Sequence, residues 1–459
     1  MSALADQLAP RAEDEPLVMA GAAPLTARAA RSVRADDAFG SAAKVALCLT
    51  APDALIRALL AFDGRVGALL LLSPSLPAET ATRLAEAAGC SDLVTDRAEL
   101  AGGPIRTRAL SAALAPDCLA DAPRPSRETL WLMTTSGTTG TPKIVPHTLR
   151  SLSHSVYRFA ARAVPNWGLL YDPTRFAGLQ VVLQALIGGG RLIAPDPAAG
   201  LGAQIETLAA ARCTHLSATP TLWRRILMAP ESARLALGQI TLGGEIVDQA
   251  VLNALADRFP RARITHIYAS TEAGVGFSVN DGRAGFPADY VGDTATGPQT
   301  AGGLRLRIAD DVLWVRPPVA GPTVAGATAD GPVERDAEGF VRTGDRVRRE
   351  GARILFLGRE SGLINVGGVK IMPESVEAVI RSVPGVAQVQ VGAKKNPLTG
   401  ALVTAAVQLG PDADPTETKR RILETCRTRL EREAVPASVR FVDGFEVNAA
   451  GKLLRRSVT

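Results

Sequence analysis

Short apolar runs alternate with longer amphipathic stretches between Lys44 and Ala101. Such runs are typical of buried strands, and apolar residues at helical spacing are typical of helices that cover a sheet. Their regular alternation predicts a parallel α/β layer. The strands are expected at Val45–Leu49, Gly67–Leu72 and Leu93–Thr95, and the helices at Pro52–Phe62 and Pro77–Ala88.

The alternation resumes after a polar stretch at residues 134–143. That stretch follows the apolar run Thr129–Met133 and precedes a helical pattern at Leu149–Ala163. Strand, glycine loop and helix in this order form a phosphate-binding context, and a second α/β layer is expected after it. Its predicted strands are Arg191–Ala194, His215–Ser217, Gln239–Leu242 and Ile264–Tyr268, and its helices are Ala203–Ala211, Pro220–Met228 and Asp248–Phe259.

The pattern changes twice more along the chain. From Tyr290 to Phe356, glycine, proline and short β runs predict a β-rich subdomain. After Gly358 a new alternation predicts a small α+β domain. The expected strands of the first region are Leu304–Ile308, Val312–Val315 and Ile354–Phe356; the second has strands Val386–Val391, Leu402–Gln408 and Val439–Val442 and helices Glu374–Arg381 and Pro415–Leu430.

A chain of 459 residues exceeds one compact core, so two domains are expected. We predict an α/β protein in which residues 1–358 form a large N-terminal domain of layered α/β subdomains plus the β-rich subdomain. Residues 359–459 are expected to form a small, mobile C-terminal α+β domain. The boundary is placed near Arg359–Gly362, because the closely spaced glycines of Gly358–Glu374 can absorb a hinge motion. A rigid linker is the alternative.

The polar stretch Thr134–Lys143 combines glycines, hydroxyls and a terminal lysine. Glycines allow a tight turn that presents backbone N–H groups, hydroxyls add neutral donors and lysine adds charge, so the stretch predicts a phosphate-binding loop. It is not a Walker loop, because Pro142 replaces the glycine before the lysine. A solvated linker is the alternative interpretation. The candidate residues are Thr134, Thr135, Ser136, Gly137, Thr138, Thr139, Gly140 and Lys143.

The run His266–Glu272 carries an apolar strand into polar residues. Ligands in α/β folds bind at strand ends. Tyr268 could stack on a flat ring, and Thr271 and Glu272 offer oxygen ligands for a Mg²⁺-bound phosphate. The alternative is an N-cap for the next helix.

Two more polar stretches are ambiguous in isolation. Asp345, in the run Arg342–Asp345, could accept two ribose hydroxyls, although Asp-containing turns are common. The run Asn448–Lys452 places a lysine beside a glycine close to the chain end, where solvated surface is the ordinary interpretation.

The composition supports a folded protein and excludes several classes of function. The net charge of +5 comes from scattered Lys and Arg, so nucleic acid binding is not expected. Five cysteines without a CxxC pair and four histidines indicate neither a disulfide framework nor a metal cluster. The N-terminus lacks a leader pattern, and the longest apolar run, Val66–Leu72, is too short to span a bilayer. A cytoplasmic protein without membrane insertion is expected.

Together these stretches resemble the adenylate-forming superfamily of AMP-binding enzymes: acyl-CoA and aryl-CoA ligases, adenylation domains of peptide synthetases, and beetle luciferase. The resemblance extends from about Lys44 over nearly the whole chain. Besides the phosphate loop, Tyr268–Glu272 matches the Tyr-Gly-Ser-Thr-Glu signature except at Ala269. Three further matches in the family's order are Thr343–Asp345, Gly358–Arg359 and Asn448–Lys452.

The resemblance implies a two-step reaction. A carboxylate and MgATP give an acyl-adenylate and pyrophosphate, and the thiol of CoA or of a carrier-protein phosphopantetheine then displaces AMP. The phosphate loop would hold the β- and γ-phosphates, Thr271 and Glu272 would lie at the α-phosphate and Mg²⁺ with Glu272 as metal ligand, and Lys452 would bridge the substrate carboxylate and the α-phosphate. The other implied nucleotide-binding residues are Gly243, Gly244, Glu245, Tyr268, Ala269, Ser270, Asp345 and Arg359.

Two features depart from the family pattern. At the hinge, where the family usually has Asp or Lys, the chain has Ser361 followed by Gly362, so a looser pivot is expected. Asn365 stands where the family frequently has a lysine. The region before the phosphate loop is short for the family, so part of the first subdomain is expected to be absent. The oligomeric state is left open.

The sequence is compatible with two classes of carboxylic acid as the substrate. Tyr171–Thr174 lies where amino-acid-activating members carry Phe-Asp-x-Ser, whose Asp binds the α-amino group, so Asp172 favours an amino acid. Arg175–Gln180 does not continue that pattern, and Asn365–Lys370 is more similar to stand-alone acyl or aryl activators. An aryl or fatty acid is ranked first and an amino acid second. The expected pocket residues are Asp172, Phe176 and Gly276.

Other outcomes stay open as hypotheses. No carrier segment follows Thr459, so the thiol acceptor is expected in trans. A catalytically silent nucleotide-binding homologue is one competitor, against which the retention of Lys452, Glu272 and Asp345 counts. A phosphotransferase that uses the glycine loop is the other, and it would release ADP instead of AMP and pyrophosphate.

Overall fold

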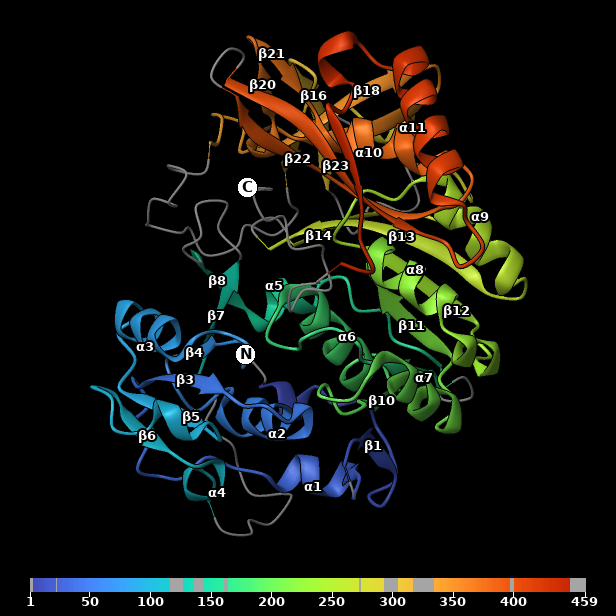
Figure 1. The fold of residues 1–459 in the computed structure, drawn as a ribbon. Helices are drawn as coiled ribbons and strands as arrows, with labels where there is room; N and C mark the ends of the chain where they lie inside the picture. Colours follow the sequence, from blue (N-terminus) through green and yellow to red (C-terminus); the bar gives the residue numbers. More distant parts are fainter. Residues whose placement is uncertain are drawn as a thin grey trace.

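The computed structural model describes residues 3–21, 23–115, 127–135, 143–160, 164–271, 274–292, 304–316, 334–396 and 400–445. Two large sheets, a five-stranded sheet and a small C-terminal domain build the fold (Figure 1), which confirms the expected α/β architecture. Within the described part of the chain, no helix combines the length and apolarity needed to cross a bilayer.

The first sheet has six strands in the order β6-β5-β3-β4-β7-β8. Its first five members are mutually parallel and only β8 runs antiparallel, so the predicted parallel layer is confirmed. The strands are β3 (Lys44–Cys48), β4 (Ala68–Leu71), β5 (Asp92–Thr95), β6 (Arg106–Arg108), β7 (Leu130–Thr135) and β8 (Lys143–Thr148), accompanied by helices α2 (Pro52–Phe62), α3 (Ala78–Ala87) and α4 (Leu110–Ala113).

The predicted order of strand, glycine loop and helix is wrong around the phosphate loop. Lys143 begins strand β8 and pairs with Thr135 across a hairpin. Helix α5 follows only at Leu149–Ser153, and residues 154–160 are not helical. The side-chain amides of Gln180 and Gln184 donate to carbonyl oxygens in and after α5, each at 2.8 Å. These tertiary hydrogen bonds replace the helical ones that the spacing predicted.

The second sheet has eight strands in the order β14-β13-β12-β11-β9-β10-β1-β2. Strand β1 pairs in parallel with β10, so the N-terminal segment completes this sheet. The sequence patterns predicted no strand before Val45. The strands are β1 (Pro16–Met19), β2 (Leu25–Thr26), β9 (Asn166–Gly168), β10 (Arg191–Ile193), β11 (His215–Ala218), β12 (Gln239–Gly243), β13 (Arg263–Ser270) and β14 (Gly274–Val279), with helices α1 (Ala27–Ser32), α6 (Phe176–Leu186), α7 (Leu201–Ala210), α8 (Pro220–Met228) and α9 (Gln249–Arg258).

The remaining sheets follow in the last third of the chain. The β-rich subdomain is an antiparallel sheet of β15 (Phe286–Pro287), β16 (Arg305–Ala309), β17 (Val312–Arg316), β18 (Val341–Glu350) and β19 (Arg353–Arg359). The C-terminal part has its own buried core, drawn from residues 364 to 441. It contains the hairpin β20 (Ile364–Val366) and β21 (Val369–Ile371), strands β22 (Val386–Asn396), β23 (Gly400–Leu409) and β24 (Ser438–Phe441), and helices α10 (Pro373–Arg381) and α11 (Pro415–Arg429).

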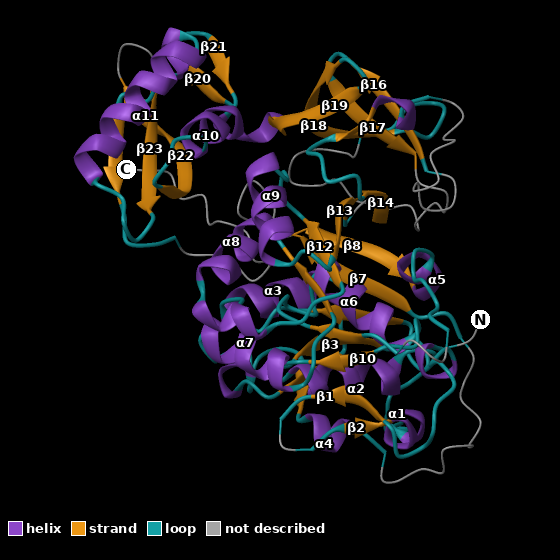
Figure 2. Cartoon of the chain, turned by 90° about the vertical axis from the view of Figure 1, so that its right-hand side faces the viewer, coloured by secondary structure: helices purple, strands orange, loops and turns teal. Residues whose placement is uncertain are grey.

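Figure 2 shows the C-terminal part and the five-stranded sheet on the same side of the two large sheets. A charged cluster joins the C-terminal part to the core: Asp248, the N-cap of α9, accepts hydrogen bonds from Arg224 of α8 and, at 3.0 Å, from Arg381 of α10. All three side chains are mostly buried. Burial alone would raise the pKa of Asp248, but the two guanidinium groups outweigh it and hold that pKa below its usual value. The domain boundary at residue 359 stays a prediction.

Replacing Arg381 with Ala should loosen the C-terminal part without unfolding the core, because Arg224 still neutralises Asp248. We expect trypsin to cleave at Arg359 or Lys370 about fivefold faster, which corresponds to on the order of 1 kcal/mol. Arg420→Ala is the control, since Arg420 pairs with Glu417 and Glu424 of its own helix. Equal cleavage rates for the wild type and Arg381→Ala would contradict the role of this contact.

Candidate functional site

The end of β13 carries the predicted signature residues at an irregularity in the sheet. The antiparallel register between β13 and β14 shifts between Tyr268 and Ala269, so Gly276 of β14 falls opposite this bulge. A Cβ atom on Gly276 would lie 2.9 Å from the Tyr268 carbonyl oxygen and 3.1 Å from its ring. Bulges re-aim side chains beside functional sites. Gly276 is therefore needed for the close approach of the two strands at Tyr268.

Tyr268 holds a fixed position between the second sheet and the five-stranded sheet. Its hydroxyl donates to Asp345 Oδ2 at 2.6 Å. Its ring stacks on Phe277 at 5.3 Å and on Phe356 at 5.4 Å, with interplanar angles of 14° and 8°. Burial, with the Asp345 carboxylate adding to it, raises the pKa of Tyr268 well above its usual value, so the hydroxyl stays a donor. Stacking of Tyr268 on adenine stays a prediction.

Asp345 forms hydrogen bonds with residues from three parts of the chain. Its Oδ1 accepts from Arg359 Nε at 2.8 Å, and the two residues are ladder partners on β18 and β19. Its backbone N–H donates to Thr343 Oγ1 at 3.0 Å, which fixes the turn around Gly344. An ionised carboxylate offers about four acceptor positions, and Tyr268 and Arg359 take two of them. The remaining positions can accept the two hydroxyls of a ribose, as the sequence predicts.

The predicted acyl-pocket residue Asp172 is already engaged within the protein. Its Oδ1 accepts from the Thr174 backbone N–H at 2.8 Å and from the Thr174 hydroxyl at 2.6 Å, and its Oδ2 accepts from the Ser73 hydroxyl. A Cβ atom on Gly178 would lie 2.2 Å from the Asp172 carbonyl oxygen, so this turn packs directly on α6. About three of the four acceptor positions of Asp172 are used.

Arg175 contacts Thr134, the first residue of the predicted phosphate loop. In the sequence, Arg175 only marked the point at which the pattern of amino-acid-activating members ends. Its Nη1 donates to the Thr134 carbonyl oxygen at 2.8 Å and to the Thr134 hydroxyl at 3.0 Å. Thr134 ends the buried part of β7 in the first sheet, whereas Arg175 precedes α6 of the second. The guanidinium therefore joins the phosphate loop to the segment of Asp172. Its position directly after the Tyr171–Thr174 signature was the available sequence signal.

His147 makes a second connection between the sheets. Its Nε2 donates to the carbonyl oxygen of Thr271 at 2.8 Å, and its ring lies 6.0 Å from that of Phe176, the first residue of α6. The side chain is buried. Thr271 and Phe176, both predicted site residues, therefore meet at His147. A single histidine in a strand is not part of any motif, so the sequence could not assign this role to His147.

The glycine-rich end of β12 lies next to the end of β13, close to Tyr268. Gly243 is the ladder partner of Ile267 on β13, and Gly244 has a left-handed φ of 82° that favours glycine. The Glu245 carboxylate accepts the backbone N–H of Thr221 at 2.9 Å, in the first turn of α8. A negative charge is favourable at a helix N-terminus. The contribution of these residues to an adenine pocket stays a prediction.

The other predicted residues are placed as follows. Thr135 and Lys143 are ladder partners on β7 and β8, and Ser361 is exposed in a short 3-10 helix, Glu360–Gly362, after β19. Ala269 and Ser270 complete β13. The predicted residues outside the described ranges are Ser136, Gly137, Thr138, Thr139, Gly140, Glu272 and Lys452.

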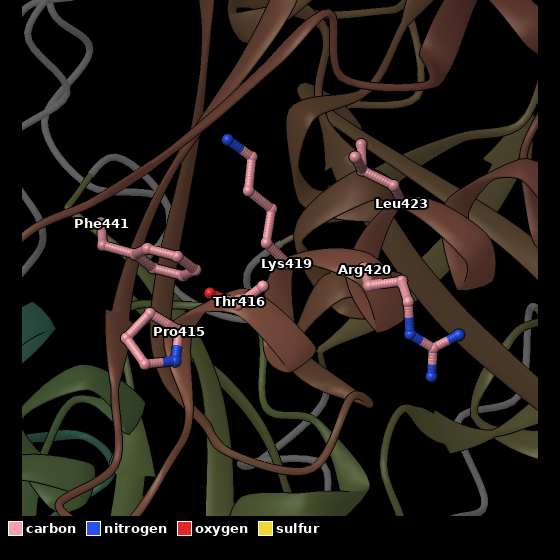
Figure 3. Close-up of a pocket in the computed structure, with 6 residues that line it drawn as sticks. All are labelled: Pro415, Thr416, Lys419, Arg420, Leu423 and Phe441. Atoms are coloured by element: carbon pink, nitrogen blue, oxygen red, sulfur yellow. The ribbon is translucent and has the colours of Figure 1, made fainter.

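A separate groove of about 350 Å³ lies on the C-terminal part, between the start of α11 and β24 (Figure 3). None of the predicted site residues lines it. The guanidinium of Arg420 is paired with Glu417 and Glu424, each within 3.0 Å. The strand ends around Asp345, Asp172 and Arg175 are therefore the stronger candidate site. The groove is lined by Pro415, Thr416, Lys419, Arg420, Leu423 and Phe441.

Comparison with protein families gives two matches in sequence order. A model described as AMP-binding enzyme matches residues 19–321, and one described as AMP-binding enzyme C-terminal domain matches residues 375–452. Two solved structures share the fold: an anthranilate CoA ligase in complex with anthranoyl-AMP (TM-score 0.78, 16% identity, 98% of this chain and 95% of that one) and ATP-bound MatB from Rhodopseudomonas palustris (TM-score 0.76, 19% identity, 98% and 96%).

Similar sequences come from several kinds of protein. The chain is 28% identical over 343 residues to a nonribosomal peptide synthetase of Aspergillus fumigatus, covering 72% of this chain and 16% of the synthetase. It is 27% identical over 387 residues to a salicylyl-CoA synthase / salicylate adenylyltransferase of a Streptomyces species (78% and 66%), and 28% identical over 356 residues to a 2-succinylbenzoate–CoA ligase of Geobacillus kaustophilus (72% and 69%). The match therefore spans only part of the length of these relatives.

Replacing Tyr268 with Phe should weaken nucleotide binding and leave the fold intact, because the ring stack remains while the donor to Asp345 is lost. We expect the affinity for ATP, measured by isothermal titration calorimetry, to fall about three- to tenfold, as for the loss of one hydrogen bond to a charged group. Tyr290→Phe is the control, since its hydroxyl donates to the Ser278 carbonyl oxygen at 3.4 Å and not to Asp345. An unchanged affinity in Tyr268→Phe would refute the assigned role.

Proposed function

Since the chain belongs to the AMP-binding enzyme family, we propose that it activates a carboxylic acid with MgATP and transfers the acyl group to a thiol. In the first step a carboxylate oxygen attacks the α-phosphorus, the bond to the pyrophosphate oxygen breaks, and an acyl-adenylate forms. In the second step a thiol sulfur attacks the acyl carbon, its proton is lost, and AMP leaves with the electrons of the C–O bond. The protein contributes positioning and electrostatic stabilisation.

The observation that carries this proposal is the convergence on Asp345. Tyr268, Asp345 and Arg359 come from three separate motifs, and their side chains are joined by bonds of 2.6 and 2.8 Å. The side chain of Asp345 is 14% exposed, so its unused acceptor positions remain within reach of a ligand. A ribose held there would direct the phosphates of ATP toward the loop after β7.

Several of the predicted residues then have a role in the first step. The loop residues Thr134–Thr139 and Lys143 hold the β- and γ-phosphates and so stabilise the leaving pyrophosphate. Thr271 donates to the α-phosphate, and Tyr268 with Gly243–Glu245 borders the adenine. Lys452 would reach from the C-terminal domain to the substrate carboxylate and the α-phosphate. These two negative groups must approach each other in the first step, and the ammonium group of the lysine would stabilise their combined charge.

Mg²⁺ would be held by Glu272 together with the phosphates of ATP. Among the described residues, no group of three or more His, Cys, Asp or Glu side chains could hold a metal ion. Mg²⁺ in nucleotide sites keeps several waters and takes only one or two carboxylates besides substrate phosphates, so a single carboxylate next to Thr271 fits this donor set. The bound ion would neutralise phosphate charge.

An aryl or fatty acid is the proposed substrate, and an amino acid is the alternative. Asp172 already accepts three hydrogen bonds from Ser73 and Thr174, which leaves too few positions to hold an ammonium group well. Relatives named for salicylate and for 2-succinylbenzoate agree with an aryl acid. The acceptor is CoA or the phosphopantetheine of a separate carrier protein, and relatives named as fatty acid–acyl carrier protein ligases support the second possibility.

Carboxylate-dependent exchange of pyrophosphate into ATP tests the proposed function directly. We expect exchange with one or more members of a panel of aryl and fatty acids, with weaker or no exchange for amino acids, because only adenylate formation makes pyrophosphate release reversible. Exchange with amino acids alone would favour the alternative substrate. A chain that binds ATP but catalyses no exchange with any acid would be a silent homologue, and formation of ADP would indicate a phosphotransferase.

Replacing Lys452 with Ala should separate the two steps. We expect the rate of exchange to fall by at least about a hundredfold, as for removal of one group that stabilises transition-state charge, while thiolysis of a supplied acyl-adenylate changes little. Lys419→Ala, in the groove on α11, is the control and should leave both steps unchanged. Equal loss of both steps in Lys452→Ala would contradict a role confined to adenylation.

A further inference from the structure

Arg175 is half-buried, and among the residues that the structure describes only one of its three guanidinium nitrogens is engaged. Nη1 makes both hydrogen bonds to Thr134. No described residue accepts a hydrogen bond from Nε or Nη2, and Arg175 forms no ion pair with a described carboxylate. Nε and Nη2 are not among the buried nitrogens that lack a partner, so both atoms reach solvent-accessible space. The guanidinium therefore has donors that no described residue uses and that a ligand can reach.

The charge around Arg175 is not neutralised by its neighbour Asp172. Asp172 attracts the guanidinium from beyond ion-pair distance, while its own oxygens accept from Ser73 and Thr174. Burial lowers the pKa of Arg175, with Asp172 acting against that effect, and an arginine in this situation stays protonated. A fixed, partly desolvated positive charge thus persists between the phosphate loop and the Asp172 turn.

Two oxyanions would enter this space if the proposed function is correct. The phosphates of ATP would lie on the loop that begins at Thr134, and the carboxylate of the acid would enter beside Asp172 and Phe176. The planar fork of a guanidinium matches both groups, because each presents two oxygens to a pair of parallel N–H donors. A purely structural arginine, in contrast, would be needed only for its Nη1 contacts to Thr134.

We propose that Arg175 binds an oxyanion of the bound substrates through Nε and Nη2 while its Nη1 holds the root of the phosphate loop. The oxyanion is either a phosphate of ATP or the carboxylate of the acid. This inference rests on the proposed function and adds to it one residue that contacts substrate, at the junction of the two large sheets. The same contact would couple nucleotide binding to the geometry of the acid pocket.

Arg175→Gln and Arg175→Lys test the proposal in the full-length chain. The first removes the charge; the second keeps it without the planar fork. Arg225→Gln is the matched control, because Arg225 lies exposed on α8. Binding of ATP and of adenosine is measured by isothermal titration calorimetry, KM for the acid is measured by pyrophosphate exchange, and the melting temperature shows whether each variant is folded.

If the oxyanion is a phosphate, Arg175→Gln weakens ATP binding about ten- to hundredfold, in line with the loss of a charge-assisted pair, and leaves adenosine binding unchanged. If it is the carboxylate, KM for the acid rises by a similar factor and ATP binding is unchanged. In both cases Arg175→Lys recovers part of the loss and Arg225→Gln shows none.

Three outcomes would overturn the proposal. One is an Arg175→Gln variant in which both ATP binding and KM for the acid are unchanged. If the wild type shows no acid-dependent exchange, unchanged ATP binding in this variant is enough to overturn the proposal. The second is an equal loss of ATP and adenosine binding, which a general disturbance of the nucleotide site would cause. The third is a fall in kcat alone. Should Arg175→Gln fail to fold, Arg175→Lys decides the matter by the same readouts, since loss of the fork should still weaken binding of one oxyanion selectively. Absence of exchange in the wild type with intact, Arg175-dependent ATP binding would reject the proposed function but not the phosphate contact.

Discussion

The carboxylate of Asp345 is the point on which the arrangement of the candidate site depends. It receives the Tyr268 hydroxyl from the second large sheet and the Arg359 guanidinium from the last residue of the five-stranded sheet. Hydrogen bonds to an ionised group are roughly twice as strong as those between neutral groups, so the Tyr268 contact helps to fix the two sheets relative to each other, while Arg359 holds Asp345 within its own sheet. A carboxylate also has more acceptor positions than these two donors use. The same group can therefore support the fold and remain available to a ligand.

A comparable junction joins the two large sheets. Strands β4, β7 and β9 end near one another, and Ser73, Thr134 and the turn at Asp172–Arg175 exchange hydrogen bonds there. His147 adds a contact from β8 to Thr271. In parallel α/β layers the carboxyl ends of strands meet on one edge, which is where ligands bind. Two such edges facing each other, with one arginine between them, explain why phosphate and acid sites would lie side by side.

The elements that the sequence predicted well are those fixed by local spacing. Helix α2 and helix α8 have the predicted bounds, both beginning with proline at a first-turn position that favours it. The predicted helix from Leu149 was too long because Gln180 and Gln184, on a helix distant in sequence, hydrogen-bond to its backbone. The strand that begins at Lys143 was missed because its pairing with β7 is a property of two segments together.

The sequence by itself determined the family, the order of α/β layers and the residues Tyr268, Asp345 and Arg359 as a set, because motifs and periodicity are carried by neighbouring residues. Only the tertiary structure decided which of these side chains form hydrogen bonds with which partners. Asp172 accepts a hydrogen bond from Ser73, and Arg175 donates to Thr134 through Nη1, the one guanidinium nitrogen that a described residue engages. Hydrogen bonds act over about 3 Å, and no local pattern encodes which distant residues the fold brings within that distance.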